Sequence, residues 1–162
     1  MKRIGIYGGT FNPPHIGHIK AAESMSRIIQ PDTFLIIPDF LPPHKSFDGM
    51  VSADDRLNMC KLAFSHVNNV HVSDIEIKRG GKSYTSCTLE ELSADDRELY
   101  FLCGSDMFLT LSDRGIEYDD ILYINNSAVG ILVFDDYYFL INTRTDIGIE
   151  IIYDIVDILI RE

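Results

Sequence analysis

Two histidines stand three residues apart near the amino end of the chain, in the stretch from Gly8 to His18 that reads GGTFNPPHIGH. His15 and His18 would lie on one side of a helix that begins at this point, because residues three apart are neighbours on a helix surface. An imidazole with a pKa of about 6.5 can donate to a phosphate oxygen when neutral and gain a proton as negative charge accumulates. This spacing therefore predicts chemistry on an anion such as phosphate.

The residues around the histidines can bring a ligand against the backbone. Gly8 and Gly9 follow a short apolar run, and without a Cβ atom they would allow a sharp turn and direct contact of a ligand with the main chain. Pro13 and Pro14 stiffen the loop. A helix that begins near Gly17 would point its free amide groups at a ligand above the loop. A structural turn with surface histidines is the plainer interpretation of the same residues.

Alternating strands and helices must position this loop. Apolar runs predict strands at RIGIYG, FLIIP and ELYFLCG and an extended segment at NVHVSDIEI. Helical spacing and capping residues predict helices at GHIKAAESMSRII, SADDRLNMCKLAFSHV and SYTSCTLEEL, and SDMFLTL begins like a helix capped by Ser105. The pattern predicts a single α/β domain of Rossmann-like type over residues 1–162, with a mostly parallel sheet and helices on both faces. Ligands of such a sheet bind at the carboxyl ends of its strands.

Two of the predicted helices have defined inner faces. The apolar face of the first consists of Ile19, Ala22, Met25 and Ile29. In the second, Ser52 and Asp55 form a variant of the capping box, and the apolar stripe consists of Leu57, Cys60, Leu62 and Phe64. Beyond Arg114 the chain is dense in Ile, Val, Tyr and Phe, which favours strands, although its final stretch is equally compatible with a helix. This last third either completes the sheet or forms a contact between copies in a homo-oligomer.

Charge and hydropathy restrict the partners. The net charge is −11, with +1 over residues 1–81 and −12 over residues 82–162. Duplex nucleic acid is disfavoured, because it requires clustered Lys and Arg, and a smaller polyanion should bind mainly through the first half. No apolar run is long enough to cross a membrane, and the first residues do not resemble a secretion signal, so we expect a cytoplasmic protein. Cys60, Cys87 and Cys103 are widely spaced, which predicts neither a disulfide framework nor a zinc site.

The histidine stretch resembles a known signature. GGTFNPPHIGH is similar to that of the nucleotidyltransferase superfamily with an H-x-G-H motif, and more narrowly to that of bacterial nicotinate-nucleotide adenylyltransferases. IPDFLPPHK, DIEIKRGGKSYTSCTLEEL and FLCGSDMF resemble further segments of that family, so the resemblance covers about residues 3–112 and leaves 113–162 divergent. It implies adenylyl transfer from ATP to nicotinate mononucleotide, with Mg²⁺ assisting, to give deamido-NAD and pyrophosphate in NAD biosynthesis.

The resemblance also implies a role for particular residues. His15 and His18 would be catalytic and would hold the α to γ phosphates of ATP. The implied ATP-binding residues are Gly8, Gly9, Thr10, Phe11, Gly17, Gly104, Ser105 and Asp106. The implied mononucleotide-binding residues are His44, Lys45, Tyr84 and Thr85, with Lys45 on the phosphate and Tyr84 and Thr85 at a helix start near the nicotinate carboxylate. No side chain is expected to ligate a metal ion.

The sequence departs from the family in its last third. The family normally has a tryptophan after the Gly-x-Asp helix and a later Ser-Ser-Thr-x-x-Arg motif for the ATP phosphates, but this chain has no tryptophan and no convincing equivalent of the motif. There is no basic residue between Arg114 and Arg144. A nucleotide-binding relic with little or no catalysis is therefore the alternative to an active enzyme. Phosphopantetheine adenylyltransferases share the H-x-G-H motif, but PPHK and GGKSYT argue against them.

Overall fold

The computed structural model describes residues 1–43, 49–104, 123–124, 127–134 and 137–143. The first half of the chain forms β1 (Lys2–Gly9), α1 (Ile16–Ile29), β2 (Thr33–Pro38), α2 (Ala53–Ala63) and β3 (Val70–Val72). The second half forms α3 (Ile75–Arg79), α4 (Thr85–Leu92), β4 (Arg97–Gly104), β5 (Tyr123–Ile124), β6 (Ser127–Phe134) and β7 (Tyr137–Thr143).

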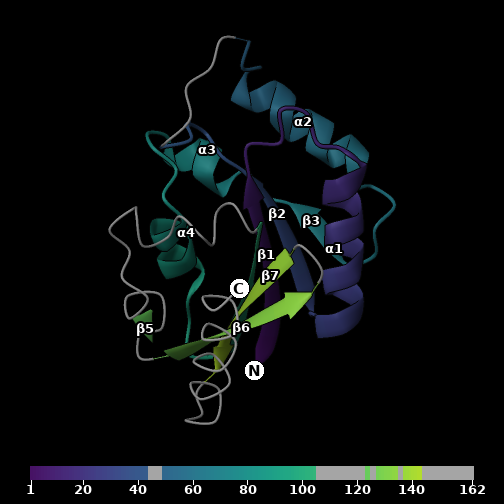
Figure 1. The fold of residues 1–162 in the computed structure, drawn as a ribbon. Coiled ribbons are helices and arrows are strands. Elements are labelled where there is room, and N and C mark those ends of the chain that lie inside the picture. Colours follow the sequence, from purple (N-terminus) through teal and green to yellow (C-terminus); the bar gives the residue numbers. More distant parts are fainter. Residues whose placement is uncertain (44–48, 105–122, 125–126, 135–136, 144–162) are drawn as a thin grey trace, which may run out of the picture.

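The strands form a seven-stranded sheet in the order β3-β2-β1-β4-β7-β6-β5 (Figure 1). The first four of these run parallel to one another, so their carboxyl ends meet at one edge. The last three run antiparallel: β7 pairs with β4, β6 with β7 and β5 with β6. The last third of the chain therefore adds strands to the sheet in residues 123–143, as one of the two sequence interpretations expected.

Helices cover both faces of the parallel strands. Figure 1 shows α1 and α2 on one side of β1 and β2, and α3 and α4 on the other. Side chains of successive strand residues point to opposite faces, so Tyr7 belongs to the core cluster with α1 and α2, whereas Ile6 lines a cavity with residues of α4. These two layers confirm the predicted Rossmann-like α/β architecture.

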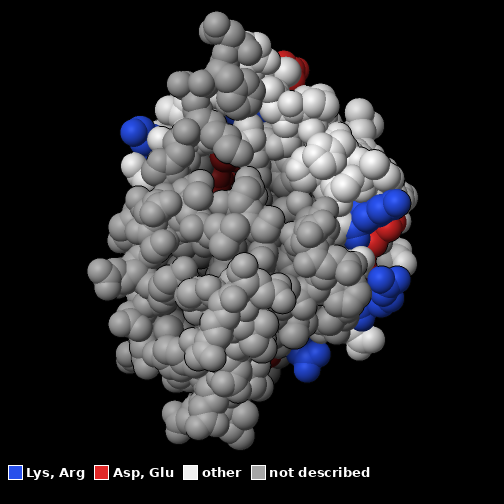
Figure 2. Space-filling model, viewed as in Figure 1, with Lys and Arg blue, Asp and Glu red and all other residues white. Residues whose placement is uncertain are grey.

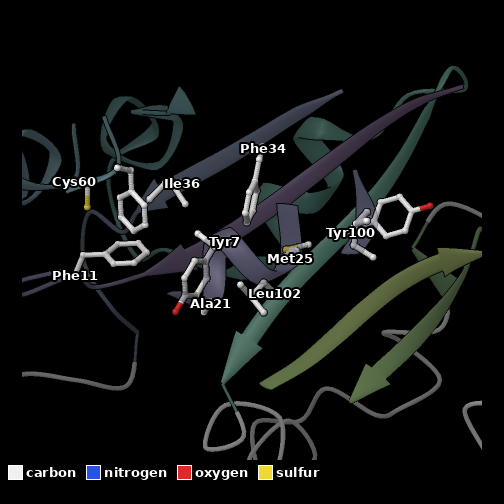
Figure 3. Close-up of a cluster of buried hydrophobic side chains, with 12 residues drawn as sticks. Tyr7, Phe11, Ala21, Met25, Phe34, Ile36, Cys60, Tyr100 and Leu102 are labelled. Atoms are coloured by element: carbon white, nitrogen blue, oxygen red, sulfur yellow. The ribbon is translucent and has the colours of Figure 1, made fainter. Parts of the chain in front are cut away.

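A hydrophobic core lies between the sheet and the pair α1 and α2. Its buried members are Tyr7, Phe11, Ala21, Ala22, Met25, Ile29, Phe34, Ile36, Cys60, Phe64, Tyr100 and Leu102. Figure 3 shows this cluster, with Phe11 and Cys60 at one end and Tyr100 at the other. The predicted inner face of α1 is confirmed, because Ala22, Met25 and Ile29 are buried and Ile19 packs against them. This core holds the amino end of α1 against the end of β1.

The structure corrects two predicted elements. Leu62 is 78% exposed and does not belong to the apolar stripe of α2, because a step of two residues from buried Cys60 turns about 200° around a helix. The extended segment predicted at NVHVSDIEI is a strand only over Val70–Val72, and α3 begins at Ile75. The Ser73 amide donates to the Ile36 carbonyl at the end of the strand pairing, and the Ser73 hydroxyl then accepts from the Ile75 amide at the start of the helix.

The capping prediction for α2 is confirmed. The Asp55 amide donates to the Ser52 hydroxyl over 3.1 Å, and that hydroxyl donates to the Asp55 carboxylate over 2.7 Å.

Among the residues that the structure describes, none of the helices combines the length and the apolar character that a membrane span requires.

Candidate functional site

His15 and His18 meet at the amino end of α1. His15 is the cap residue, and its backbone amide donates to His18 Nδ1 over 3.0 Å. The two rings stack with their centroids 3.7 Å apart and an interplanar angle of 30°. The prediction that both rings lie on one side of a helix start is therefore confirmed.

His18 is held as a neutral donor. Its ring also packs edge-on against Phe11, with the centroids 5.0 Å apart, and lies 6.0 Å from the ring of Tyr7. Burial among these rings lowers the pKa of His18 to about 4, and the neighbouring His15 makes a smaller contribution in the same direction. A neutral imidazole that accepts at Nδ1 carries its proton on Nε2. Near neutral pH, His18 can therefore donate from Nε2 to an anion and can gain a proton when negative charge approaches.

The chain between β1 and α1 bends at Asn12 and Pro13 rather than at the two glycines. Gly8 and Gly9 are the last residues of β1, so the sharp turn predicted at them is wrong. Phe11 is only 2% exposed and has φ of 47°, in the left-handed region that a bulky residue rarely adopts. A Cβ atom on Gly9 would lie 3.2 Å from the Phe11 ring, so Gly9 leaves room for that ring. The buried ring thus anchors the connection between β1 and α1 in the core, next to His18.

Thr10 is hydrogen-bonded to both members of a buried ion pair, Asp39 and Arg56, that joins two loops. The Thr10 hydroxyl donates to Asp39 Oδ2 over 2.8 Å, and Arg56 Nη1 donates to Asp39 Oδ1 over 2.8 Å and to the Thr10 carbonyl over 2.7 Å. Arg56 is 1% exposed and comes from α2, whereas Asp39 directly follows β2. The loops that leave β1 and β2 are therefore fastened to each other through a side chain of α2.

Gly8 and Thr85 share a cavity at the carboxyl ends of β1 and β2. It has a volume of about 10 Å³, room for about one water molecule, and is lined by Ile6, Gly8, Ile37, Glu76, Thr85, Thr88, Leu89 and Phe101. Thr85 is the first residue of α4 and Tyr84 its exposed cap residue. Gly8, a predicted ATP contact, and Thr85, a predicted mononucleotide contact, therefore line the same small cavity.

Glu76 is the buried acid of this cavity. The Thr88 hydroxyl donates to Glu76 Oε1 over 2.5 Å, and Arg79 Nη2 donates to that hydroxyl over 2.7 Å. Burial raises the pKa of Glu76, an effect that hydrogen bonds from Thr88 and Ser83 partly oppose. The carboxyl group ties α3 to the first turns of α4, and so fixes the position of Tyr84 and Thr85.

Of the other predicted site residues, some lie in described elements and some fall outside the residues that the structure describes. Gly17 belongs to the first turn of α1, and Gly104 ends β4 at the edge where β1 also ends. His44, Lys45, Ser105 and Asp106 fall outside the residues that the structure describes.

Basic side chains accompany the histidines on α1. Figure 2 shows Lys and Arg gathered along the edge of the molecule on which α1 lies. The helix carries exposed Lys20 and Arg27. The first half of the sequence, which has the positive charge balance, therefore places basic side chains on α1. The amino end of the same helix holds the two histidines.

Sequence reasoning missed Asp39, Arg56 and Glu76. A signal existed for Arg56, because it adjoins Leu57 and stands four residues before Cys60, on the face of α2 that must be buried. An arginine at such a position needs polar partners in the interior. Asp39 also had a signal, since it directly follows an apolar strand whose end was predicted to face a ligand.

Helices cover both faces of the parallel strands, and His15 and His18 lie at the edge where these strands end, which is where α/β sheets of this class bind their ligands. A model of the cytidylyltransferase-like family matches residues 6–150. The match extends over most of the sequence, and the chain belongs to that family.

Curated relatives point more narrowly. The chain is 45% identical over 109 residues to a probable nicotinate-nucleotide adenylyltransferase from Desulfatibacillum aliphaticivorans, a match that covers 67% of this chain and 50% of the relative. It is 43% identical over 120 residues to a protein of the same name from Shouchella clausii, over 72% of this chain and 62% of the relative. These matches confirm the resemblance that the motifs indicate. The chain spans about half the length of the first relative and less than two thirds of the second.

Solved structures support the fold. A Plasmodium falciparum nicotinic acid mononucleotide adenylyltransferase complexed with NaAD has a TM-score of 0.58 and 22% identity, over 68% of this chain and 56% of that chain. The same enzyme complexed with APC has a TM-score of 0.57 and 20% identity, over 70% of this chain and 56% of that chain. At this identity the similarity concerns the Rossmann-like fold.

Proposed function

We propose that this chain is a nicotinate-nucleotide adenylyltransferase, which transfers the adenylyl group of ATP to nicotinate mononucleotide. The observation that carries the proposal is the arrangement of His15 and His18 at the start of α1, where the backbone bond to Nδ1 leaves Nε2 of His18 as the donor. The names of the curated relatives supply the substrates. The product is deamido-NAD, an intermediate in NAD biosynthesis, and we place the reaction in the cytoplasm.

The proposed reaction is a direct displacement at phosphorus. A phosphate oxygen of the mononucleotide bonds to the α-phosphorus of ATP, the bond from that phosphorus to the bridging oxygen breaks, and pyrophosphate leaves. The protein must hold two anions in line and stabilise the charge that develops. Nε2 of His18 would donate to the phosphates of ATP, His15 would assist it, and the amide groups at the start of α1 would face the same charge.

The mononucleotide would lie between the loop after β2 and the start of α4. We assign its phosphate to His44 and Lys45, and its nicotinate group to Tyr84 and Thr85. Support comes from the small cavity that both Gly8 and Thr85 line, because it shows that the start of α4 lies near the end of β1. The residues assigned to ATP are Gly8, Gly9, Thr10, Phe11, Gly17, Gly104, Ser105 and Asp106.

Mg²⁺ belongs to the proposal as the ion that ATP brings on its phosphates. In the described part of the chain, no three His, Cys, Asp or Glu side chains are grouped so that they could hold a metal ion. We assign no protein ligand to it. When bound, Mg²⁺ would neutralise phosphate charge beside the histidines.

The direct test is pyrophosphate release from ATP in the presence of nicotinate mononucleotide or nicotinamide mononucleotide in turn. We expect release with the nicotinate substrate. Equal rates with both mononucleotides would contradict the assigned substrate. ATP binding without release with either one would identify a nucleotide-binding relic instead.

Three substitutions of His18 separate its two roles. His18→Ala should lower kcat/KM by a factor on the order of 10² or more, by analogy with the loss of an oxyanion donor. His18→Asn can still accept from the His15 amide through Oδ1 but lacks a donor at the Nε2 position, so we expect a loss close to that of alanine. His18→Gln can present a donor there and should recover part of the activity. Steady-state kinetics with near-normal turnover of the alanine variant would disprove the assignment.

A further inference from the structure

We propose that Arg56 is a positioning residue that sets the spacing between two loops of the proposed site. One is the loop after β1, which carries proposed ATP contacts and which we call the ATP loop. The other is the loop after β2, which leads to the proposed mononucleotide contacts and which we call the mononucleotide loop. The inference rests on the proposed function for the identity of the two ligands. Its structural basis is the buried group formed by Thr10, Asp39 and Arg56, which we call the loop clamp. Arg56 reaches neither loop by sequence proximity: it lies 46 residues from Thr10 and 17 from Asp39.

The guanidinium group is bound on every nitrogen. Nη1 donates to the Thr10 carbonyl and to Asp39 Oδ1, and Nη2 donates to the Phe40 carbonyl over 3.1 Å. Nε donates to the Val51 carbonyl over 3.2 Å. One side chain thus holds the backbone just after β1, the backbone just after β2 and the segment that leads into α2.

Each loop in the clamp carries proposed ligand contacts. Thr10 and its neighbours Gly9 and Phe11 belong to the ATP loop, and the Asp39 amide donates to the Gly9 carbonyl over 3.0 Å. The chain that continues past Phe40 leads to the mononucleotide loop with Lys45. A shift of Arg56 would therefore move one ligand relative to the other.

The clamp also reaches the nicotinate side. The Phe40 amide donates to the Ser83 hydroxyl over 2.9 Å, and the Ser83 amide donates to the Leu41 carbonyl over 2.9 Å. Ser83 directly precedes Tyr84 at the start of α4. All three loops that line the proposed site therefore share one hydrogen-bonded frame, with Arg56 at its buried end.

The choice of arginine fits positioning better than stability. A buried ion pair adds little net stability, since the two charges must leave water. A planar guanidinium fork fixes the directions of several bonds at once, which the single ammonium group of lysine cannot do. An in-line displacement is sensitive to such directions, because a misplacement of about 1 Å can cost about 10²-fold in rate.

The test compares Arg56→Lys and Arg56→Met with Ile29→Ala. Ile29 is a core residue at the far end of α1 from the histidines, so its truncation lowers stability without touching the clamp. We measure kcat and KM for both substrates, the Kd of ATP and of nicotinate mononucleotide alone, and Tm. All assays are run below the unfolding transition of each variant.

We expect Arg56→Lys to lower kcat by about 10²-fold, with each separate Kd within about threefold of the wild type. Ile29→Ala should keep its kcat. Arg56→Met provides a second variant without charge and should lose at least as much rate. A kcat of Arg56→Lys within about threefold of the wild type would overturn the inference while leaving the proposed function intact.

A second measurement does not depend on turnover. The Asp39 amide donates to the Gly9 carbonyl and the Phe40 amide to the Ser83 hydroxyl, so both hydrogen bonds join segments that the clamp holds together. The hydrogen exchange of these two amides should become at least about tenfold faster in Arg56→Lys, relative to the amide of Ile6 in β1. Ile29→Ala should not change that ratio. If the wild type releases no pyrophosphate, the proposed function fails and this ratio alone decides the inference; an unchanged ratio overturns it.

Discussion

At the scale of single residues, the chemistry depends on how His18 is held. Its Nδ1 accepts from the backbone of His15, and its ring is enclosed by Phe11, Tyr7 and His15. These contacts keep the imidazole neutral and fix which nitrogen carries the proton. A surface histidine at the same place in the sequence would have neither property.

The pH dependence of His18 follows from its burial. The ring should titrate near pH 4 rather than near 6.5. Between these values the unfolded chain binds a proton that the folded chain does not, so the contribution of neutral His18 is complete above about pH 6.5 and is lost as the pH falls toward 4. Ring ¹⁵N shifts measure the titration directly. Over the same range the Tm of the wild type should fall more steeply than that of His18→Asn, and parallel curves would contradict the assignment.

At the scale of elements, Gly5 and Gly8 of β1 have different structural roles. A Cβ atom on Gly5 would come within 2.8 Å of the Phe34 ring, which lies directly across the pairing of β1 with β2. A Cβ atom on Gly8 would make only ordinary contact, 3.7 Å from Phe101. Gly5 therefore serves packing, whereas Gly8 remains available for a ligand.

Alanine substitution should separate these roles. Gly5→Ala forces the Phe34 ring or the strand to move, which should lower the free energy of unfolding by about 1–3 kcal/mol. Gly8→Ala should leave that free energy within about 0.5 kcal/mol of the wild type but weaken ATP binding. Urea denaturation and ATP titration of both variants measure the two effects. Equal destabilisation by the two substitutions would show that Gly8 also serves packing.

Most elements near the site could be predicted from local sequence. The helix after the histidines, the cap formed by Ser52 and the strands before each loop all depend on residues a few positions apart, and all are confirmed. The prediction that Leu62 belongs to the buried stripe is wrong, because the angle of this residue around α2 points its side chain to solvent.

At the scale of the whole molecule, the site exists only where the parallel strands end together. β1 and β2 bring their loops side by side, and α4 covers the same edge from the second face. The antiparallel strands β5 to β7 extend the sheet on the side of β4. A homo-oligomer remains a prediction from the sequence, which a size measurement in solution tests.

ATP should stabilise the whole fold by mass action. At about 100 times its Kd, a ligand that binds only the folded state adds about 2.7 kcal/mol, or about 5–10 °C in Tm for a chain of this size. Adenosine lacks the phosphates that the histidines and the start of α1 would meet, and should give a much smaller shift at the same concentration. Thermal denaturation with each ligand makes the comparison. Equal shifts would place the binding energy on the base and sugar rather than on the anion.

The sequence by itself determined the local units of this protein: the strand and the helix around GGTFNPPHIGH, the placement of His15 and His18 on one side of the helix start, and the mostly parallel α/β class. These properties depend on spacing within one or two helical turns and on the alternation of apolar runs. Only the tertiary structure decided that Phe11 is buried in a left-handed backbone conformation and that Arg56 fastens the loop after β1 to the loop after β2. Such contacts join residues far apart in the chain, and they depend on which buried groups need partners once the loops have packed together.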